Sequence, residues 1–167
     1  QSINVSNNVL KAEAAKVFAE MLKINTTLQS VNVKGNQLGD AGHRILGQAL
    51  LEATSSKLAF IQCDQFSLGQ SDKELNLQGK NLTALDAILL GGVLKANTTL
   101  KSINLENNEF NDNSANTVAE ALVHSNIRSL KINDYFSIPF TKSKDTMSTS
   151  ALAGLVSRDM PIDLHGG

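Results

Sequence analysis

Hydrophobic and polar residues alternate in seven short segments of the chain, and most of the stretches between them repeat hydrophobic residues with a helical period. In each short segment two apolar residues flank a polar one, which is typical of a β-strand with one buried face. The alternation predicts strands at residues 2–5, 30–33, 60–63, 74–77, 102–105, 129–132 and 161–164. We expect these strands to form one parallel sheet.

Four of the intervening stretches carry apolar residues on one helical face. These apolar residues lie seven, eight, eleven and twelve positions after the hydrophobic residue that precedes the helix. After Leu38, for example, they are Ile45, Leu46, Ala49 and Leu50. These offsets form one stripe of a helix with 3.6 residues per turn. The stripes predict helices at residues 11–24, 40–53, 84–96 and 112–124, each packing on the buried face of the strands.

One phrase occurs twice and sets the period of the pattern. Residues 23–38 read KINTTLQSVNVKGNQL, and residues 95–110 read KANTTLKSINLENNEF. Both contain L-x-x-[VI]-x-[VL]-x-x-N-x-[LF], the signature of a leucine-rich repeat. The asparagine of this signature is Asn8, Asn36 and Asn108 in three units. We expect these side-chain amides to be buried and to form hydrogen bonds with the backbone N–H and C=O groups of the turns, which have no partners within a helix or strand.

The units are not all equal. In three units the signature asparagine is replaced, by Phe66, Lys80 and Tyr135. In addition, the connection between the strands at 60–63 and 74–77 is too short to contain a helix. Residues 67–74 are therefore expected to form an irregular crossing. The domain prediction is a single leucine-rich repeat solenoid fragment over 1–167, with a short irregular unit at 64–76 and a linker-like stretch at 141–150. The segment at 161–164 begins like another repeat, so we expect a piece of a larger protein.

The longer phrase N-T-T-L-x-S-[VI]-x-[VL]-x-x-N-x-[LF] resembles the ribonuclease-inhibitor-like class of leucine-rich repeats, over about residues 2–133. It is similar to the repeats of immune-receptor sensors and of Ran GTPase-activating proteins. The resemblance implies an α/β solenoid with parallel strands on the concave face and helices on the convex face. Ribonuclease inhibitors are rich in cysteine and acidic residues, which this chain is not. GTPase activation would need a functional arginine, and Arg44, Arg128 and Arg158 are isolated.

Charge and composition narrow the partner class. The net charge is −1, and no cluster of Lys and Arg provides the footprint of a nucleic-acid or anionic-membrane binder. No apolar run is long enough for membrane insertion. Cys63 is the single cysteine, so a cytoplasmic or other reducing intracellular compartment is expected. Sequons at Asn4, Asn25, Asn81 and Asn97 are expected by chance in so asparagine-rich a chain.

The sequence shows no constellation that would support catalysis. His43, His124 and His165 lie in different units without ligand spacing, and Gly91-Gly92 falls inside a predicted helix rather than in a phosphate-binding loop. Cys63 replaces an inward aliphatic residue and is expected to be a buried, inert thiol. We therefore expect no enzyme, no cofactor and no metal site.

The candidate binding residues are those that project from the strand face. They are the polar residues between the two apolar positions, with members of the adjacent column and one aromatic: Asn4, Asn32, Lys34, Phe60, Gln62, Asn76, Asn104, Glu106 and Lys131. Asp163 would continue the row. A ladder of amides bonded to one another, or an ordinary solvated face, explains the same pattern. Tyr135, Phe136 and Phe140 form a second candidate, either a docking patch or core filling.

The predicted function is a non-catalytic protein–protein interaction or scaffold module of a larger intracellular protein or assembly, with a protein partner of unknown identity. One alternative is a regulatory leucine-rich domain that acts on a small GTPase or as an immune-type sensor. An enzyme is the remaining alternative, and it would need a nucleophile–base pair or a metal constellation.

Overall fold

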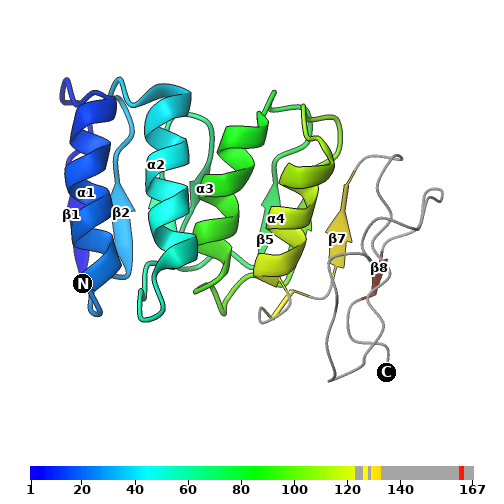
Figure 1. The fold of residues 1–167 in the computed structure, drawn as a ribbon. Coiled ribbons are helices and arrows are strands. Elements are labelled where there is room, and N and C mark those ends of the chain that lie inside the picture. Colours follow the sequence, from blue (N-terminus) through cyan, green and yellow to red (C-terminus); the bar gives the residue numbers. More distant parts are fainter. Residues whose placement is uncertain (123–125, 128, 133–161, 164–167) are drawn as a thin grey trace.

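The helices of this protein stand side by side in one row, with the strands on the other side (Figure 1). The computed structural model describes residues 1–122, 126–127, 129–132 and 162–163. The helices are α1 (Ala12–Ile24), α2 (Gly39–Glu52), α3 (Ala84–Leu94) and α4 (Asp112–Leu122). The strands are β1 (Ser2–Asn4), β2 (Ser30–Asn32), β3 (Phe60–Gln62), β4 (Ser67–Leu68), β5 (Glu74–Asn76), β6 (Ser102–Asn104), β7 (Ser129–Lys131) and β8 (Ile162–Asp163). These bounds confirm the predicted helices to within two residues at each end, and all seven predicted strands.

The strands form two sheets, so the prediction of one parallel sheet was wrong. The first sheet has the order β1-β2-β3-β4 and the second has the order β5-β6-β7-β8. β1, β2 and β3 run parallel, as do β5, β6 and β7, but β4 is antiparallel to β3 and β8 is antiparallel to β7. The expected irregular crossing at 67–74 thus contains a strand, and the predicted strand at 161–164 pairs in the opposite sense.

The break between the sheets follows from the short connection after β3. A parallel neighbour needs a crossover of a dozen or more residues, whereas an antiparallel one needs only a tight turn. The chain turns back directly after β3, with the Cys63 N–H donating to the Phe66 carbonyl at 2.9 Å. β4 then pairs with the edge of β3 that β5 would otherwise use. In consequence β5 starts a new sheet.

Helix formation follows the predicted stripes. In α2 the stripe residues Leu46, Ala49 and Leu50 are buried. In α3 nearly every residue is buried, because α2 contacts one side of it and α4 the other. The N-terminus of α3 is fixed by a capping box in which Thr83 accepts from the Leu85 and Asp86 N–H groups. Apolar side chains of the helices and strands meet in one continuous core.

Two glycines allow α2 and α3 to approach closely. A Cβ atom at Gly47 would lie 2.5 Å from the backbone of Ile88, and one at Gly92 would lie 2.7 Å from Leu50 Cβ. Lys95 adds a polar link, because its Nζ donates to the Leu51 carbonyl at the end of α2 at 2.6 Å. The helices α2 and α3 therefore pack directly against each other, although the strands of their units belong to different sheets.

Candidate functional site

The predicted binding residues fall into two rows, one on each sheet. The pairing register aligns Asn4, Asn32 and Gln62 across β1, β2 and β3. It aligns Asn76, Asn104 and Lys131 across β5, β6 and β7. The rows belong to different sheets, so the structure divides the predicted surface into two parts.

The row asparagines do not bond to one another as a ladder. Each side-chain oxygen instead accepts a backbone N–H two residues further on. The distances are 3.0 Å for Asn4 to Ser6, 3.0 Å for Asn32 to Lys34, 3.1 Å for Asn76 to Gln78 and 3.0 Å for Asn104 to Glu106. These hydrogen bonds fix the orientation of each asparagine side chain at the end of its strand. A single long contact, from Asn104 Nδ2 to Gln78 Oε1 at 3.5 Å, links neighbouring units within the described rows.

A groove lies over the second row. It has a volume of about 210 Å³ and extends over the β5, β6 and β7 strands. Its polar lining consists of Asn76, Asn104 and Lys131, together with a parallel row of Glu74, Ser102 and Ser129. The row of Glu74, Ser102 and Ser129 was missed from the sequence. It could have been found, because residues two apart on a strand point to the same face.

The other predicted residues lie around the first row and at the strand ends. Phe60 is half-buried in β3, in register with Ser30 rather than with the amide row. Lys34 is exposed after β2, and Glu106 is half-buried after β6. Neither lines the groove. The predicted candidates Asp163 and Tyr135–Phe140 have side chains outside the described residues, as do His124, His165 and the stretch at 141–150.

Of the three signature asparagines, Asn36 and Asn108 are buried, as predicted, whereas Asn8 is exposed and the prediction was wrong for it. Asn36 and Asn108 are each 8% exposed. Asn36 Nδ2 donates to the carbonyls of Val33, in its own unit, and Val5, in the preceding unit, at 2.8 and 3.0 Å. Asn108 makes the matching bonds to Leu105 and Leu77, both below 3.0 Å. These side chains are buried links between units and are unavailable to a partner.

A buried His–Asp pair joins α2 to α3, and the sequence did not indicate it. His43 Nδ1 lies 2.7 Å from Asp86 Oδ1, and both side chains are at most 3% exposed. Asp86 Oδ2 also accepts from the Thr83 N–H at 2.9 Å. Burial would raise the pKa of the Asp86 carboxyl, but the hydrogen bonds from His43 and Thr83 outweigh it and lower the pKa below 3.8. An ionised carboxylate only accepts, so His43 Nδ1 is the donor.

Cys63 is a free, buried thiol, as predicted. Burial raises its pKa to about 11, and its Sγ donates to the Phe66 carbonyl. It is thus protonated at neutral pH and a poor nucleophile. The described residues contain no group of three or more His, Cys, Asp or Glu side chains that would hold a metal ion.

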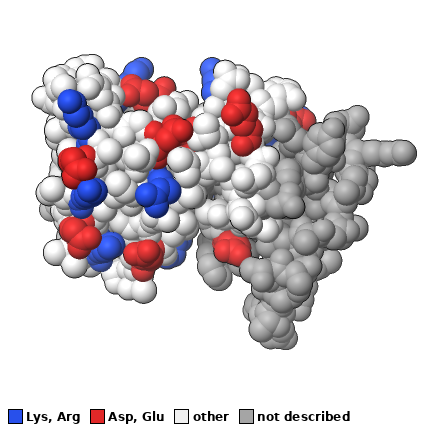
Figure 2. All heavy atoms as spheres, turned by 45° about the horizontal axis from the view of Figure 1, so that its top comes forward, with Lys and Arg blue, Asp and Glu red and all other residues white. Residues whose placement is uncertain are grey.

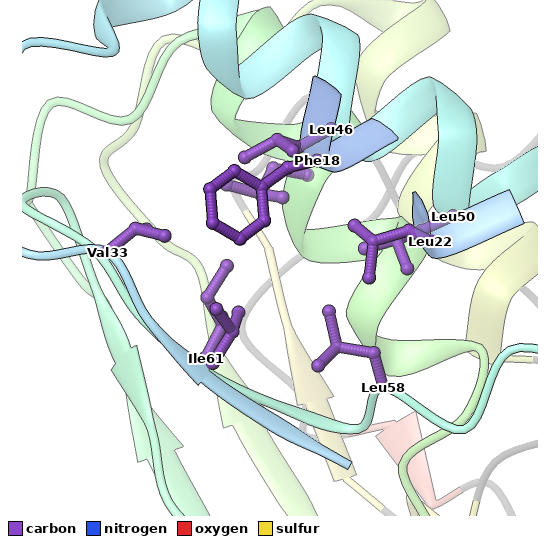
Figure 3. A pocket seen from close by; sticks show the side chains of 9 residues that line it. Phe18, Leu22, Val33, Leu46, Leu50, Leu58 and Ile61 are labelled. Carbon is purple, nitrogen blue, oxygen red and sulfur yellow. The ribbon is translucent and has the colours of Figure 1, made fainter. Parts of the chain in front are cut away.

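A cavity between the first sheet and the helices α1, α2 and α3 is too small and too apolar for a ligand. Its volume is about 10 Å³, and its lining is entirely hydrophobic. Figure 3 shows Phe18, Leu46 and Leu50 of the helices facing Val33 and Ile61 on the strand side across this space. The space is about one water molecule in size, and it offers no polar partner. The cavity is a packing gap in the core.

The helix face carries charges of both signs. Figure 2 shows basic and acidic side chains interspersed there, most densely at the α1 end, without a continuous basic patch among the coloured residues. Two exposed ion pairs account for part of this pattern, Lys16 with Glu13 and Lys23 with Glu20. A bilayer crossing needs a longer apolar helix than any that the described residues form.

Strand, turn, buried asparagine and helix thus recur in fixed order, and comparison with known proteins identifies the pattern. A family model described as Leucine Rich repeat matches residues 25–43 and 96–119, which cover most of the two copies of the repeated phrase. The chain is a leucine-rich repeat protein of the ribonuclease-inhibitor-like class. Repeat arrays of this kind present extended surfaces for binding other molecules.

The relatives agree with this class. The chain is 28% identical to the ribonuclease inhibitor of Sus scrofa over 125 residues, which is 75% of this chain and 24% of that protein. It is 25% identical to "NACHT, LRR and PYD domains-containing protein 3" of Rattus norvegicus over 138 residues, 81% of this chain and 12% of that protein. The Mus musculus protein of the same name matches to the same extent. The leucine-rich repeat chain thus spans a quarter or less of the length of these relatives.

Proposed function

We propose that this leucine-rich repeat chain is a non-catalytic protein-interaction module, and that its docking surface is the groove over β5, β6 and β7. The observation that carries the proposal is the pair of polar rows that the register aligns across three parallel strands. In a repeat array the strand face is continuous from unit to unit, so such rows can follow an extended partner segment.

The chemistry of the groove favours a polar polypeptide. Asn76 Nδ2 has no hydrogen-bond partner among the described residues, and Asn104 Nδ2 has only the 3.5 Å contact to Gln78. Both amides therefore keep donors for a partner's backbone carbonyls. Glu74 and Lys131 stand on the outer strands of the groove with opposite charges. This arrangement favours a partner segment with a cation and an anion in matching order.

The experiment replaces the groove amides without disturbing their local bonds. Asp at positions 76 and 104 keeps the oxygen that accepts the backbone N–H and replaces the amide donor with a charged acceptor. The matched control is Asn4→Asp with Asn32→Asp, because these residues make the same local bond on the first sheet. The partner is recovered with the wild-type chain and identified by mass spectrometry. Its Kd is then measured for the three proteins.

We expect the groove pair Asn76→Asp/Asn104→Asp to weaken binding at least tenfold, which corresponds to ~1.4 kcal/mol. The control pair should change the Kd less than about threefold, a free-energy change well below that. Circular dichroism is recorded on all three proteins to check the fold. If the groove pair leaves the Kd unchanged, or the control pair has the larger effect, the docking surface is not this groove.

The match to the NACHT, LRR and PYD domains-containing proteins favours a second candidate function, a regulatory leucine-rich region of an immune-type sensor. In that case the module would act within a larger chain that carries a nucleotide-binding domain. Sequence on either side of this chain discriminates between the two. We further propose that residues 1–167 form one curved solenoid fragment with the strands on its concave face, and that it acts in a reducing compartment. The buried free thiol of Cys63 supports the last point.

A further inference from the structure

The chain contains two copies of one block of strands. The distance along the chain from Ser2 in β1 to Glu74 in β5, and from Ser30 in β2 to Ser102 in β6, is 72 residues in each case. Each block continues with a third parallel strand, β3 or β7, and then with an antiparallel strand, β4 or β8. Each residue in the three parallel strands of the first sheet therefore has a counterpart at a matched position of the second sheet.

Some matched positions hold the same residue in both sheets. Asn4 and Asn32 of the first sheet match Asn76 and Asn104 of the second, and all four accept the backbone N–H two residues further on, at 3.0 or 3.1 Å. Because these asparagines recur with the same local hydrogen bond, they support the strand ends that both blocks share. They do not by themselves distinguish one surface from the other.

The groove differs from the first sheet at three matched positions. Two of the differences introduce a charge, and the third replaces an aromatic ring with a small hydroxyl side chain. They are Glu74 in place of Ser2, Lys131 in place of Gln62, and Ser129 in place of Phe60. The two rows of the first sheet thus hold no charged residue, whereas those of the groove hold one charge of each sign.

The two groove charges are accessible to a partner. Glu74 and Lys131 are both exposed, and neither forms an ion pair with another described residue. They lie on the two outer strands of the groove, with β6 between them. Each can therefore pair with an opposite charge on a docked segment and repel a like charge.

The register fixes the separation of the two charges. Ser129 lies level with Glu74 two strands away, and Lys131 is two residues beyond Ser129. With strands about 4.8 Å apart and a rise of about 3.3 Å per residue, the Cα atoms of Glu74 and Lys131 are about 12 Å apart. In an extended segment, residues four positions apart are separated by about 13 Å and point to the same face. Such a segment can reach both charges when it crosses the three strands.

We propose that Glu74 and Lys131 determine the specificity of the groove, and that they select an extended polypeptide segment with a basic and an acidic residue four positions apart. The basic residue lies over β5 against Glu74, and the acidic residue lies over β7 against Lys131. The small side chain of Ser129 leaves room for the segment where Phe60 lies on the first sheet. This inference rests on the proposed function of the groove.

The test measures the binding of five synthetic peptides to the full chain. The peptides have capped ends and a neutral Ser/Thr background. Four carry two charges four positions apart, as Lys/Asp, Asp/Lys, Lys/Lys or Asp/Asp, and the fifth carries Lys and Asp two positions apart. Both mixed orders are included because a segment can cross the strands in either direction. The Kd is measured by NMR titration, in which the backbone amides of Asn76, Asn104 and Lys131 report binding in the groove.

The wild-type chain should prefer a mixed peptide. We expect the better of the two mixed peptides with four-residue spacing to bind at least about threefold more tightly than the Lys/Lys, Asp/Asp and short-spaced peptides, a ratio typical of exposed ion pairs. Glu74→Lys leaves two cations in the groove, so the Asp/Asp peptide should become the tightest. Lys131→Glu leaves two anions, so the Lys/Lys peptide should become the tightest.

Lys34→Glu is the matched control for these charge reversals. Lys34 is exposed after β2 of the first sheet and does not line the groove. The variant should therefore keep the wild-type order of preference among the five peptides. An order that changes in Lys34→Glu as it does in Lys131→Glu would overturn the assignment of specificity to the groove charges.

The remaining outcomes separate this inference from the proposed function. Equal Kd values for all five peptides, or an order of preference that Glu74→Lys and Lys131→Glu leave unchanged, overturn the inference and leave the groove as a docking surface. So does the absence of any shift of the groove amides, when Asn76→Asp/Asn104→Asp still weakens binding of the recovered partner. If that pair of substitutions also leaves the partner's Kd unchanged, the proposed function fails as well.

Discussion

Asn36 and Asn108 hold neighbouring units together through buried hydrogen bonds. We predict that Asn36→Leu lowers the free energy of unfolding by ~1–3 kcal/mol, because it leaves the Val33 carbonyl and the Leu10 N–H without partners. It also removes one of the two amide donors to the Val5 carbonyl. Asn32→Leu is the matched control and should cost much less, since it removes one solvent-accessible bond. Urea unfolding of both variants measures the difference. Equal losses of unfolding free energy in the two variants would mean that Asn36 and Asn32 have been assigned to the wrong faces, buried and solvent-accessible.

Asp86 provides the second prediction at this scale. We expect Asp86→Asn to lower the free energy of unfolding by ~1.5–3 kcal/mol at neutral pH, because it removes a buried carboxylate that accepts hydrogen bonds from His43 and Thr83. The pKa of Asp86 is lowered in the folded state, so its stabilising effect is complete above its ordinary value of 3.8 and is lost as the pH falls through the lower folded value.

Urea unfolding at several pH values checks this sign. The difference in unfolding free energy between wild type and Asp86→Asn should narrow as the pH falls below 3.8. A difference that does not narrow there would show that Asp86 is not held ionised by its partners. Such a result would remove the carboxylate from the contact between α2 and α3.

The residue scale also shows what sequence can and cannot reveal. Asn36 was predictable because the signature places it at a fixed offset from a strand. The partnership of His43 with Asp86 was not, because the two residues lie 43 positions apart on different helices. Their helices, α2 and α3, are neighbours because the connection between β3 and β5 contains no helix that would lie between them. Asp86 alone could have been recognised, since Thr83-x-x-Asp86 fits a capping box.

At the scale of elements, the contact between α2 and α3 rests on glycine. Gly47→Ala should lower the free energy of unfolding by ~1–3 kcal/mol, because the added methyl group would lie 2.5 Å from backbone atoms of α3. Gly91→Ala is the control in the same row of helices, where the nearest atoms of Thr117 are 3.2 Å away. The better helix propensity of alanine offsets that milder contact, so its effect should be under ~1 kcal/mol.

Thermal unfolding of Gly47→Ala and Gly91→Ala tests this contact directly. If both variants were as stable as the wild type, α2 and α3 would have room to separate. The close approach of α2 and α3 would then contribute nothing to the free energy of unfolding.

Strand and helix positions were predictable because hydrophobic periodicity records them locally. The division into two sheets was not, because it depends on which edge of β3 is occupied. Residues 64–73 are too short for a crossover helix, which the sequence did indicate. That Ser67–Leu68 would fold back and pair with β3 depends on a tight turn whose residues, around Gln65, follow no strong turn pattern.

At the scale of the whole molecule, the two sheets give the candidate surface two parts of different character. The amide rows were predictable from the residue between the two apolar positions of each strand. The groove was not, because its hollow depends on how β5, β6 and β7 lie relative to one another. The separation also turns Asn32 and Asn104, which look equivalent in sequence, into residues of different surfaces.

Site-specific photo-cross-linking tests the central claim most directly. A photoreactive phenylalanine analogue is placed at Lys131 in the groove or, as the control, at the exposed Glu120 on the helix side of α4. Each protein is irradiated with the partner that the wild-type chain recovers, and adducts are identified by mass spectrometry. The account predicts an adduct from position 131 and none from position 120. An adduct from position 120 with none from position 131 would contradict it and assign binding to the helices.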